Sequence, residues 1–377
     1  MYVATANSMP MITVFPGDHI LHNPPHELLE GQLVEPHESP VRAQIIHDAV
    51  EVAVLGPIVP PRPFGLAPLR AVHSEDYLQY LEHGYERWVA AGGAPAAIIP
   101  DTFAVRWMAH PPHDGLATPG YYTFDTSAPI VAGTYQAARM AADAALTGAA
   151  LLLEGQRAAY ALCRPPGHHA GRDLCGGYCF LNNAAIAAEY LLQQTKDARR
   201  KTKEEHEQDN SFRPSSIVHR PTVAVLDIDY HHGNGTQQIF YERADVLCIS
   251  IHADPVFEYP SFSGYADERG AGAGMGYNLN LPLPKGTDNA RFLAALEQAL
   301  QAIRNYAPRF LVLSAGFDTF DGDPLGKFTL TTDVYGEIGA RIAALAMPTL
   351  IVQEGGYATA ALGKNTVNLL QAFDREN

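Results

Sequence analysis

Residues 226–235 read LDIDYHHGNG and come directly after PTVAV at 221–225, a short apolar and β-branched segment. Such a segment is typical of a buried parallel strand. Because side chains alternate along an extended chain, Asp227, Asp229 and His231 project to one side at the carboxyl end of that strand. A carboxylate and an imidazole two residues apart on one face can bind a single divalent cation. The sequence therefore predicts a metal site where this strand ends.

A third acidic side chain follows another apolar run, FLVLSAGFD at 310–318, which ends in Asp318. Two carboxylates and one imidazole, with coordination positions left open, are typical of a catalytic zinc site rather than of a structural one. The plainer alternative is that Asp229 and His231 only solvate a loop. Asp318 and a pair of adjacent histidines elsewhere in the chain favour the catalytic interpretation.

Short apolar runs alternate along the chain with helical patterns. This alternation predicts an α/β fold, in which a mostly parallel sheet has helices on both faces and the active site lies at the carboxyl ends of the strands. We expect residues 1–377 to form a single domain. The predicted strands lie at 11–15, 158–163, 222–226, 246–251, 310–315 and 348–353, and the predicted helices at 74–91, 133–153, 182–194, 288–306 and 332–346.

One segment breaks this alternation. Residues 195–220 are charged and polar and contain almost no large apolar side chain. This composition predicts a solvated, mobile insertion between a helix and the strand at 222–226. A basic recognition tail is the alternative, and it is disfavoured because the acidic residues of the segment nearly balance its basic residues.

The composition narrows the class of protein. Hydrophobic residues make up 47% of the chain and charged residues 18%, which is enough for a large core. The net charge of −15 disfavours nucleic acid and an anionic membrane surface as partners, and it would attract cationic substrates. The four cysteines form no C-x-x-C pair, the first ten residues carry no secretory signal, and no apolar run reaches 18 residues. We therefore expect a reduced cytoplasmic protein, with the nucleus as the alternative location.

The segment RPPGHHA at 164–170 follows a predicted strand, and its Pro-Pro-Gly turn can aim His168 and His169 into one cavity. An amide hydrolase needs an acceptor for the proton of the attacking water and a donor for the departing amine, and imidazoles serve both tasks. Each imidazole also needs an orienting partner on its far nitrogen, for which Asp227 and Asn234 are the candidates. Alternatively, the two histidines are themselves metal ligands or plain loop residues.

Three aromatic residues are candidates for the site: one follows a predicted strand and two lie on loops. Tyr357, in EGGY at 354–357, would stabilise the oxyanion of a tetrahedral intermediate if its hydroxyl lies beside the metal; simple packing is the alternative. Gly177 and Tyr178 in GGYCF, and Tyr259 in FEYP, are on loops. Two facing rings there would form a narrow apolar tunnel for an alkyl chain that carries a cation at its far end.

The motifs RPPGHHA, GGYCFLNNAA (176–185), DIDYHHGNGTQ (227–237), SAGFDTFDGDP (314–324) and EGGY together resemble the signatures of the zinc-dependent deacetylase superfamily. That superfamily contains histone deacetylases and acetylpolyamine amidohydrolases on an arginase-like α/β fold. The resemblance extends from residue 12 to residue 372 apart from 195–220. The segments ELLEGQLV (27–34), FYER (240–243) and HADPVFEYPSFSGYADERGAGAG (252–274) look most like bacterial acetylpolyamine amidohydrolases.

The resemblance implies two cation sites. One Zn²⁺ per chain would be held by Asp229, His231 and Asp318. A structural monovalent cation such as K⁺ would lie near Asp227 and Ser250.

The resemblance also implies the catalytic roles. His169, paired with Asn234, would be the proton shuttle, and His168, paired with Asp227, would be its electrostatic partner. Tyr357 would polarise the carbonyl group of the substrate. The tunnel walls would come from Gly177, Tyr178 and Tyr259.

Two departures from the polyamine enzymes concern the rim of the tunnel. Asp114 matches a rim aspartate that binds the substrate backbone or amine, but Leu116 stands where such enzymes can place a glutamate. Leu325 stands where one polyamine-selective branch has a glutamate and lysine deacetylases often have leucine. The chain therefore lacks two acidic features that would have decided the substrate.

The sequence predicts a zinc amidohydrolase that removes acetyl groups from small cationic N-acetylated amines such as acetylpolyamines, and a protein acetyllysine deacetylase is the alternative. A deacetylase-like binding module without turnover is disfavoured because every expected catalytic side chain is present. A dimanganese hydrolase of the arginase type would need further Asp and His ligands. The oligomeric state is left open, with a homodimer as one option.

Overall fold

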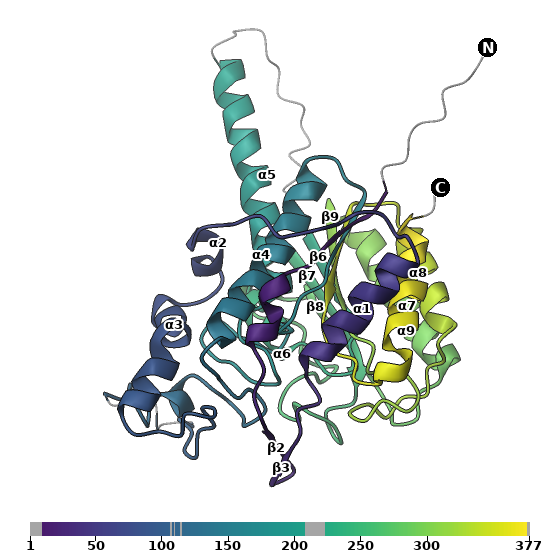
Figure 1. The fold of residues 1–377 in the computed structure, drawn as a ribbon. Coiled ribbons are helices and arrows are strands. Elements are labelled where there is room, and N and C mark those ends of the chain that lie inside the picture. The colour runs from purple at the N-terminus through teal and green to yellow at the C-terminus, as the bar shows by residue number, and fades with distance from the viewer. Residues whose placement is uncertain (1–9, 106–107, 109, 114, 208–222, 375–377) are drawn as a thin grey trace, which may run out of the picture.

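Eight strands form one sheet in which all neighbouring strands are parallel (Figure 1). The computed structural model describes residues 10–105, 108, 110–113, 115–207 and 223–374. The order across the sheet is β4 (Ile58–Val59), β1 (Ile12–Val14), β5 (Ala158–Ala161), β10 (Thr349–Gln353), β9 (Phe310–Ala315), β6 (Val223–Asp227), β7 (Val246–Ala253) and β8 (Asn278–Leu283). A separate antiparallel hairpin pairs β2 (Glu27–Leu29) with β3 (Gln32–Val34) and projects from the body.

Helices cover both faces of the sheet, as Figure 1 shows. One face packs against α2 (Ala67–Arg70), α3 (Glu75–Ala90), α4 (Thr134–Leu153), α5 (Asn183–Glu207) and α6 (Asn234–Phe240). The other packs against α1 (Pro40–Val52), α7 (Asn289–Tyr306), α8 (Val334–Ala343) and α9 (Thr359–Asp374). Short 3₁₀ turns lie at Gly17–Leu21, Pro119–Tyr121 and Gly272–Gly274. The predicted α/β fold is therefore confirmed.

The central strands are apolar throughout because both of their faces are buried. In β6, Val223 and Val225 belong to the core cluster under α4 and α5, whereas Ala224 and Leu226 belong to the cluster under α1 and α7–α9. Alternating side chains thus enter opposite cores, which explains the continuous apolar runs that predicted the strands.

The predicted insertion is partly wrong. Helix α5 does not end at Gln194 but continues to Glu207, so that residues 195–207 are helical rather than irregular. Lys, Glu and Arg make up most of this stretch, and all have high helix propensity, so a helix can continue there without an apolar face to bury. Residues 208–220 lie outside the described residues.

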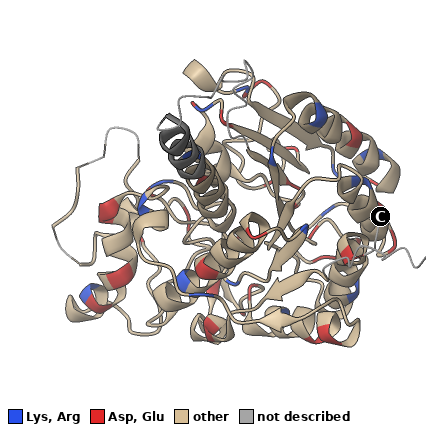
Figure 2. Cartoon of the chain, turned by 90° about the horizontal axis from the view of Figure 1, so that it is seen from above, with Lys and Arg blue, Asp and Glu red and all other residues tan. Residues whose placement is uncertain are grey.

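Helices α1 and α9 were not predicted. They pack on each other and on the same face of the sheet, and Figure 1 shows them side by side with α8. Among the described helices, none combines the length and the apolar character needed to cross a membrane. Figure 2 shows acidic and basic residues interspersed over the outer helices rather than separated by sign.

Candidate active site

Four loops meet at one edge of the sheet, because they follow the carboxyl ends of the four adjacent strands β5, β10, β9 and β6. These loops carry the four motifs RPPGHHA, EGGY, SAGFDTFDGDP and DIDYHHGNGTQ. Strand order, rather than chain order, thus brings the predicted catalytic residues together. The site lies where parallel α/β sheets bind ligands.

Asp229, His231 and Asp318 form a buried cluster whose ligand atoms all lie within 4.8 Å of one another. His231 Nδ1 is 3.3 Å from Asp229 Oδ1 and 3.1 Å from Asp318 Oδ2. Backbone amides fix the other carboxylate oxygens: Tyr230 N donates to Asp318 Oδ1 at 2.8 Å and Gly355 N donates to Asp229 Oδ2 at 2.9 Å. The three side chains are therefore oriented towards a common point.

The electrostatics of this cluster fit a bound cation. Burial raises the pKa of Asp318 to about 7, and the adjacent charge of Asp229 adds to the effect. Burial alone would lower the pKa of His231, but hydrogen bonds to Asp229 and Asp318 raise it to about 10. Two buried carboxylates thus hold a positive charge where the three side chains meet. A Cβ on Gly355 would lie 2.5 Å from Asp318 Oδ2 and 2.7 Å from Asp229 Oδ2, so that only glycine leaves room for both carboxylates.

The two adjacent histidines have different partners and different charge states. His168 Nδ1 lies 2.9 Å from Asp227 Oδ2, and His169 Nδ1 lies 2.7 Å from Asn234 Oδ1, which are the two pairs that the resemblance implied. Burial disfavours the charged form of His168, but Asp229 and Asp227 outweigh it and raise its pKa to about 10. Burial, followed by the charges of His168 and His231, holds the pKa of His169 well below its usual value. Burial thus favours the neutral form of His169, whereas the two aspartates favour the charged form of His168.

Tyr357 is held from two sides. Its backbone N–H donates to Asp323 Oδ2 at 2.6 Å, and the N–H of Ala358 donates to the same oxygen at 2.8 Å. The guanidinium carbon of Arg42 lies 4.7 Å from the centroid of the Tyr357 ring, and Arg42 Nε donates to Gly356 O at 2.6 Å. These contacts fix both the backbone and the ring of Tyr357. Gly355, two positions earlier, donates to Asp229, so the tyrosine follows directly on the acidic cluster.

The two aromatic residues predicted to wall the tunnel each lie beside another predicted site residue. The Tyr178 ring lies 5.8 Å from the Tyr357 ring, whereas the Tyr259 ring lies 5.0 Å from the His169 ring at an angle of 87°. Tyr178 has a φ of 66°, a strained conformation for a residue with a Cβ, and strain of this kind gathers at functional sites. Gly177 precedes it, and a Cβ there would overlap the His169 ring.

The remaining predicted residues lie at the rim or deeper in the fold. Leu325 is half-buried, and its N–H donates to Asp323 Oδ1 at 3.0 Å. Asp114 lies outside the described residues. Ser250 is the β7 neighbour of Asp227, and both line one small cavity, although Ser250 Oγ is also 2.7 Å from His252 Nδ1.

Several residues that shape the site were missed by sequence reasoning. Glu354 Oε2 accepts hydrogen bonds from the N–H groups of Gly167 and His168, at 2.7 Å and 3.2 Å, and so fixes the histidine turn. The sequence could have indicated Asp323, because an Asp directly before Pro favours a turn in which the Asp carboxylate accepts a hydrogen bond from the backbone two residues later. Arg42 and Asp125 have no such signal, since each acts on residues far away in the chain.

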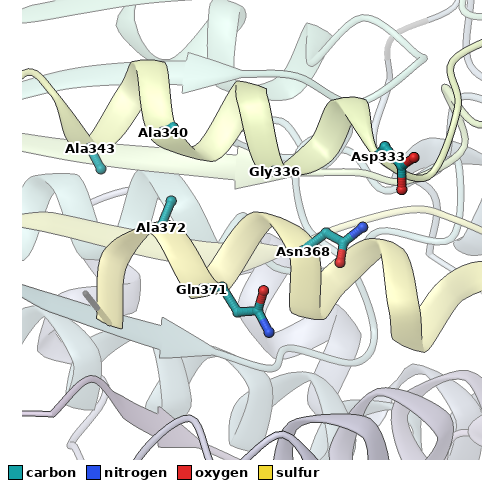
Figure 3. Close-up of a pocket in the computed structure, with 7 residues that line it drawn as sticks. All are labelled: Asp333, Gly336, Ala340, Ala343, Asn368, Gln371 and Ala372. Carbon is teal, nitrogen blue, oxygen red and sulfur yellow. The ribbon is translucent and has the colours of Figure 1, made fainter.

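A groove of about 420 Å³ lies between α8 and α9, away from this site (Figure 3). Its lining consists of Asp333, Gly336, Ala340, Ala343, Asn368, Gln371 and Ala372. Asp333 is the one ionisable side chain of this lining, so the groove does not provide the paired acid and base that hydrolysis requires. The chemistry of the protein therefore belongs to the sheet edge.

Comparison with known proteins agrees with this geometry. The family model described as the histone deacetylase domain matches residues 36–201 and 215–373. The chain belongs to this family of deacetylases. The family model leaves out residues 202–214, which lie at the end of α5 and beyond it. As a member of this family, the chain is a hydrolase that acts on amides.

Individual relatives are similar over nearly their whole length. "Acetylpolyamine amidohydrolase 2" of Pseudomonas aeruginosa is 45% identical over 97% of this chain and 99% of its own. "Acetylpolyamine amidohydrolase" of Mycoplana ramosa is 41% identical over 96% and 99%. The crystal structure of an acetylpolyamine aminohydrolase from Burkholderia pseudomallei superposes with a TM-score of 0.85 at 41% identity, covering 96% of this chain and 98% of that one.

Proposed function

We propose that this deacetylase hydrolyses acetylpolyamines or similar small N-acetylated amines with one Zn²⁺ bound to Asp229, His231 and Asp318. The observation that carries the proposal is the convergence of this buried cluster with His168, His169 and Tyr357 at one point of the sheet edge. Four relatives at 41–46% identity bear the name acetylpolyamine amidohydrolase, which supports the substrate class.

The metal, when bound, would supply a Lewis acid for the acetyl carbonyl and lower the pKa of the attacking water. His169 is suited to accept the proton of that water. An amide oxygen only accepts hydrogen bonds, so Asn234 Oδ1 keeps the proton of His169 on Nδ1 and leaves Nε2 with a free lone pair. The same nitrogen then donates the proton to the departing amine.

Asp229 and Asp227 favour the positively charged form of His168 beside His169. Its ring centroid is 4.0 Å from that of His169, and Asp227 fixes its orientation. A neighbouring cation makes the imidazolium of His169 a stronger acid and so favours delivery of the proton to the amine. The hydroxyl of Tyr357 donates a hydrogen bond to the acetyl oxygen as negative charge develops there. A K⁺ ion near Asp227 and Ser250 remains part of the proposal.

Parallel turnover measurements test the substrate class. We expect higher kcat/KM for acetylputrescine and acetylspermidine than for an acetyllysine peptide, and full loss of activity after chelation with recovery on adding one equivalent of Zn²⁺. A tenfold or greater preference for the peptide would overturn the polyamine assignment and favour the protein deacetylase alternative. Recovery only with another metal would overturn the assignment of zinc.

A further inference from the structure

Asp125 joins two loops that surround the active site. Its Oδ2 accepts hydrogen bonds from Tyr259 Oη at 2.6 Å and from Gly177 N at 3.0 Å, while its Oδ1 accepts one from Ser127 N at 3.0 Å. Tyr259 is 134 positions away in the chain. Asp125 as a whole residue is half-buried.

The partners of Asp125 touch the catalytic histidine. The Tyr259 ring is 5.0 Å from the His169 ring and 6.0 Å from the His231 ring. A Cβ on Gly177 would overlap the His169 ring and lie 2.7 Å from Tyr259 Oη. Asp125 therefore bonds directly to two residues, Tyr259 and Gly177, that lie against the His169 ring.

The charge of Asp125 is not balanced by a cation of the protein. Its three hydrogen-bond donors are neutral, and no Lys or Arg within the described ranges forms an ion pair with it. Glu258, beside Tyr259 in the chain, differs in this respect because Lys327 Nζ lies 2.8 Å from its Oε2. Desolvation raises the pKa of Asp125, which shows the cost of keeping this carboxylate charged.

The carboxylate also retains capacity for one more donor. Two carboxylate oxygens offer about four acceptor positions, and the protein uses three of them here. An anion with an acceptor position to spare, bonded to a ring predicted to wall the substrate tunnel, matches an ammonium group at the far end of an alkyl chain.

We propose that Asp125 determines substrate specificity by binding the distal ammonium of an N-acetylated diamine or polyamine. The proposal rests on the proposed function and deepens it, because it names the group that distinguishes a cationic acetylamine from a neutral amide. The opposing interpretation is that Asp125 only clamps the two loops together, in which case it treats cationic and neutral substrates alike.

Two substrates of equal length separate these interpretations. Acetylputrescine ends in an ammonium group, and N-pentylacetamide carries a methyl group at the same position. The quantity to measure is the ratio of their kcat/KM values. For Asp125→Asn we expect this ratio to fall about fivefold, the upper end for an ion pair at a partly exposed site. In the parent enzyme the ratio should itself fall as salt rises from 50 to 500 mM, because added ions screen the pair.

Tyr259→Phe is the matched control. It removes one hydrogen bond of the clamp and keeps the carboxylate charged, so kcat/KM falls for both substrates and their ratio stays within about twofold of the parent value. An Asp125→Asn ratio equal to that of the parent, or an equal change in Tyr259→Phe, would overturn the proposal. Zinc content and thermal unfolding of each variant show whether it has folded.

Other outcomes separate this proposal from the proposed function. If Asp125→Asn does not fold, the salt dependence of the parent ratio decides alone, and a ratio independent of salt rejects the ammonium site. If the parent enzyme hydrolyses acetylputrescine well and Asp125→Asn leaves the ratio of the two kcat/KM values unchanged, only the role of Asp125 is rejected. A parent enzyme that turns over an acetyllysine peptide but not acetylputrescine rejects the proposed function itself.

Discussion

Removal of the Tyr357 hydroxyl should abolish most turnover without disturbing the fold. In Tyr357→Phe the backbone N–H still donates to Asp323 Oδ2 and the ring still lies under the Arg42 guanidinium, because neither contact involves the hydroxyl. The free energy of unfolding should therefore change by less than about 1 kcal/mol. Loss of one donor to a developing oxyanion costs about 2.7–4 kcal/mol, so kcat should fall about 10²- to 10³-fold.

The assay compares kcat and KM for acetylputrescine with zinc content in the same preparations, and KM and zinc should stay close to the parent values. Tyr335→Phe is the control, since Tyr335 Oη bonds to Thr319 Oγ1 and to Phe317 O in the core behind the site. That variant should lose about 1 kcal/mol of stability and keep kcat within twofold. A Tyr357→Phe enzyme within threefold of the parent kcat would refute the assigned role of the hydroxyl.

Three further perturbations test other parts of the site and the fold. Asp318→Ala should lose both stoichiometric zinc and activity, and elemental analysis that finds one zinc per chain would contradict the ligand assignment. Asp323→Asn should lower kcat about tenfold with zinc retained, because an amide cannot accept hydrogen bonds at both of its ends. When it is combined with Tyr357→Phe, the Asp323 substitution should change kcat very little further. A loss of kcat that is additive in the double variant would exclude action through the tyrosine. Burial lowers the pKa of His73 from 6.5 to about 4. Protons then bind preferentially to the unfolded chain between these values, so the stability contributed by His73 is full above pH 6.5 and about 3 kcal/mol is lost as pH falls to 4. Urea unfolding should show this loss in the parent and in the exposed-site control His83→Gln but not in His73→Gln, and equal pH dependence in all three would contradict it.

The strands of the fold were predictable because each is a local pattern. A strand buried on both faces must be apolar at every position, and β9 was predicted with its observed bounds from the run at 310–315. The end of α5 was not predictable in this way. Residues 195–207 have no apolar face, and a polar helix and a polar loop can have the same composition.

The contacts of the candidate site also differ in whether a local sequence pattern could predict them. Strand alternation predicted Asp229 and His231 on one side, but β6 ends at Asp227 and both residues lie in the loop beyond it, where His231 N donates to Asp229 Oδ1 at 2.9 Å. The pairing of His169 with Asn234 and of His168 with Asp227 came from the resemblance to known deacetylases, and the structure has both hydrogen bonds. That the Tyr178 and Tyr259 rings face each other across a tunnel stays a prediction; the structure places Tyr178 beside Tyr357 and Tyr259 beside His169.

The sequence by itself therefore determined the kinds of ligand and base, the strands that present them and the buried character of the sheet, since these depend on side-chain chemistry and on alternation over a few residues. Tertiary structure decided which strands are neighbours. Only the order β5-β10-β9-β6 brings Asp318 to within 3.1 Å of His231, and only the packing of distant loops brings Asp125 to within 2.6 Å of Tyr259. These contacts depend on how the two helical layers pack against the one sheet, and no local pattern of residues specifies that packing.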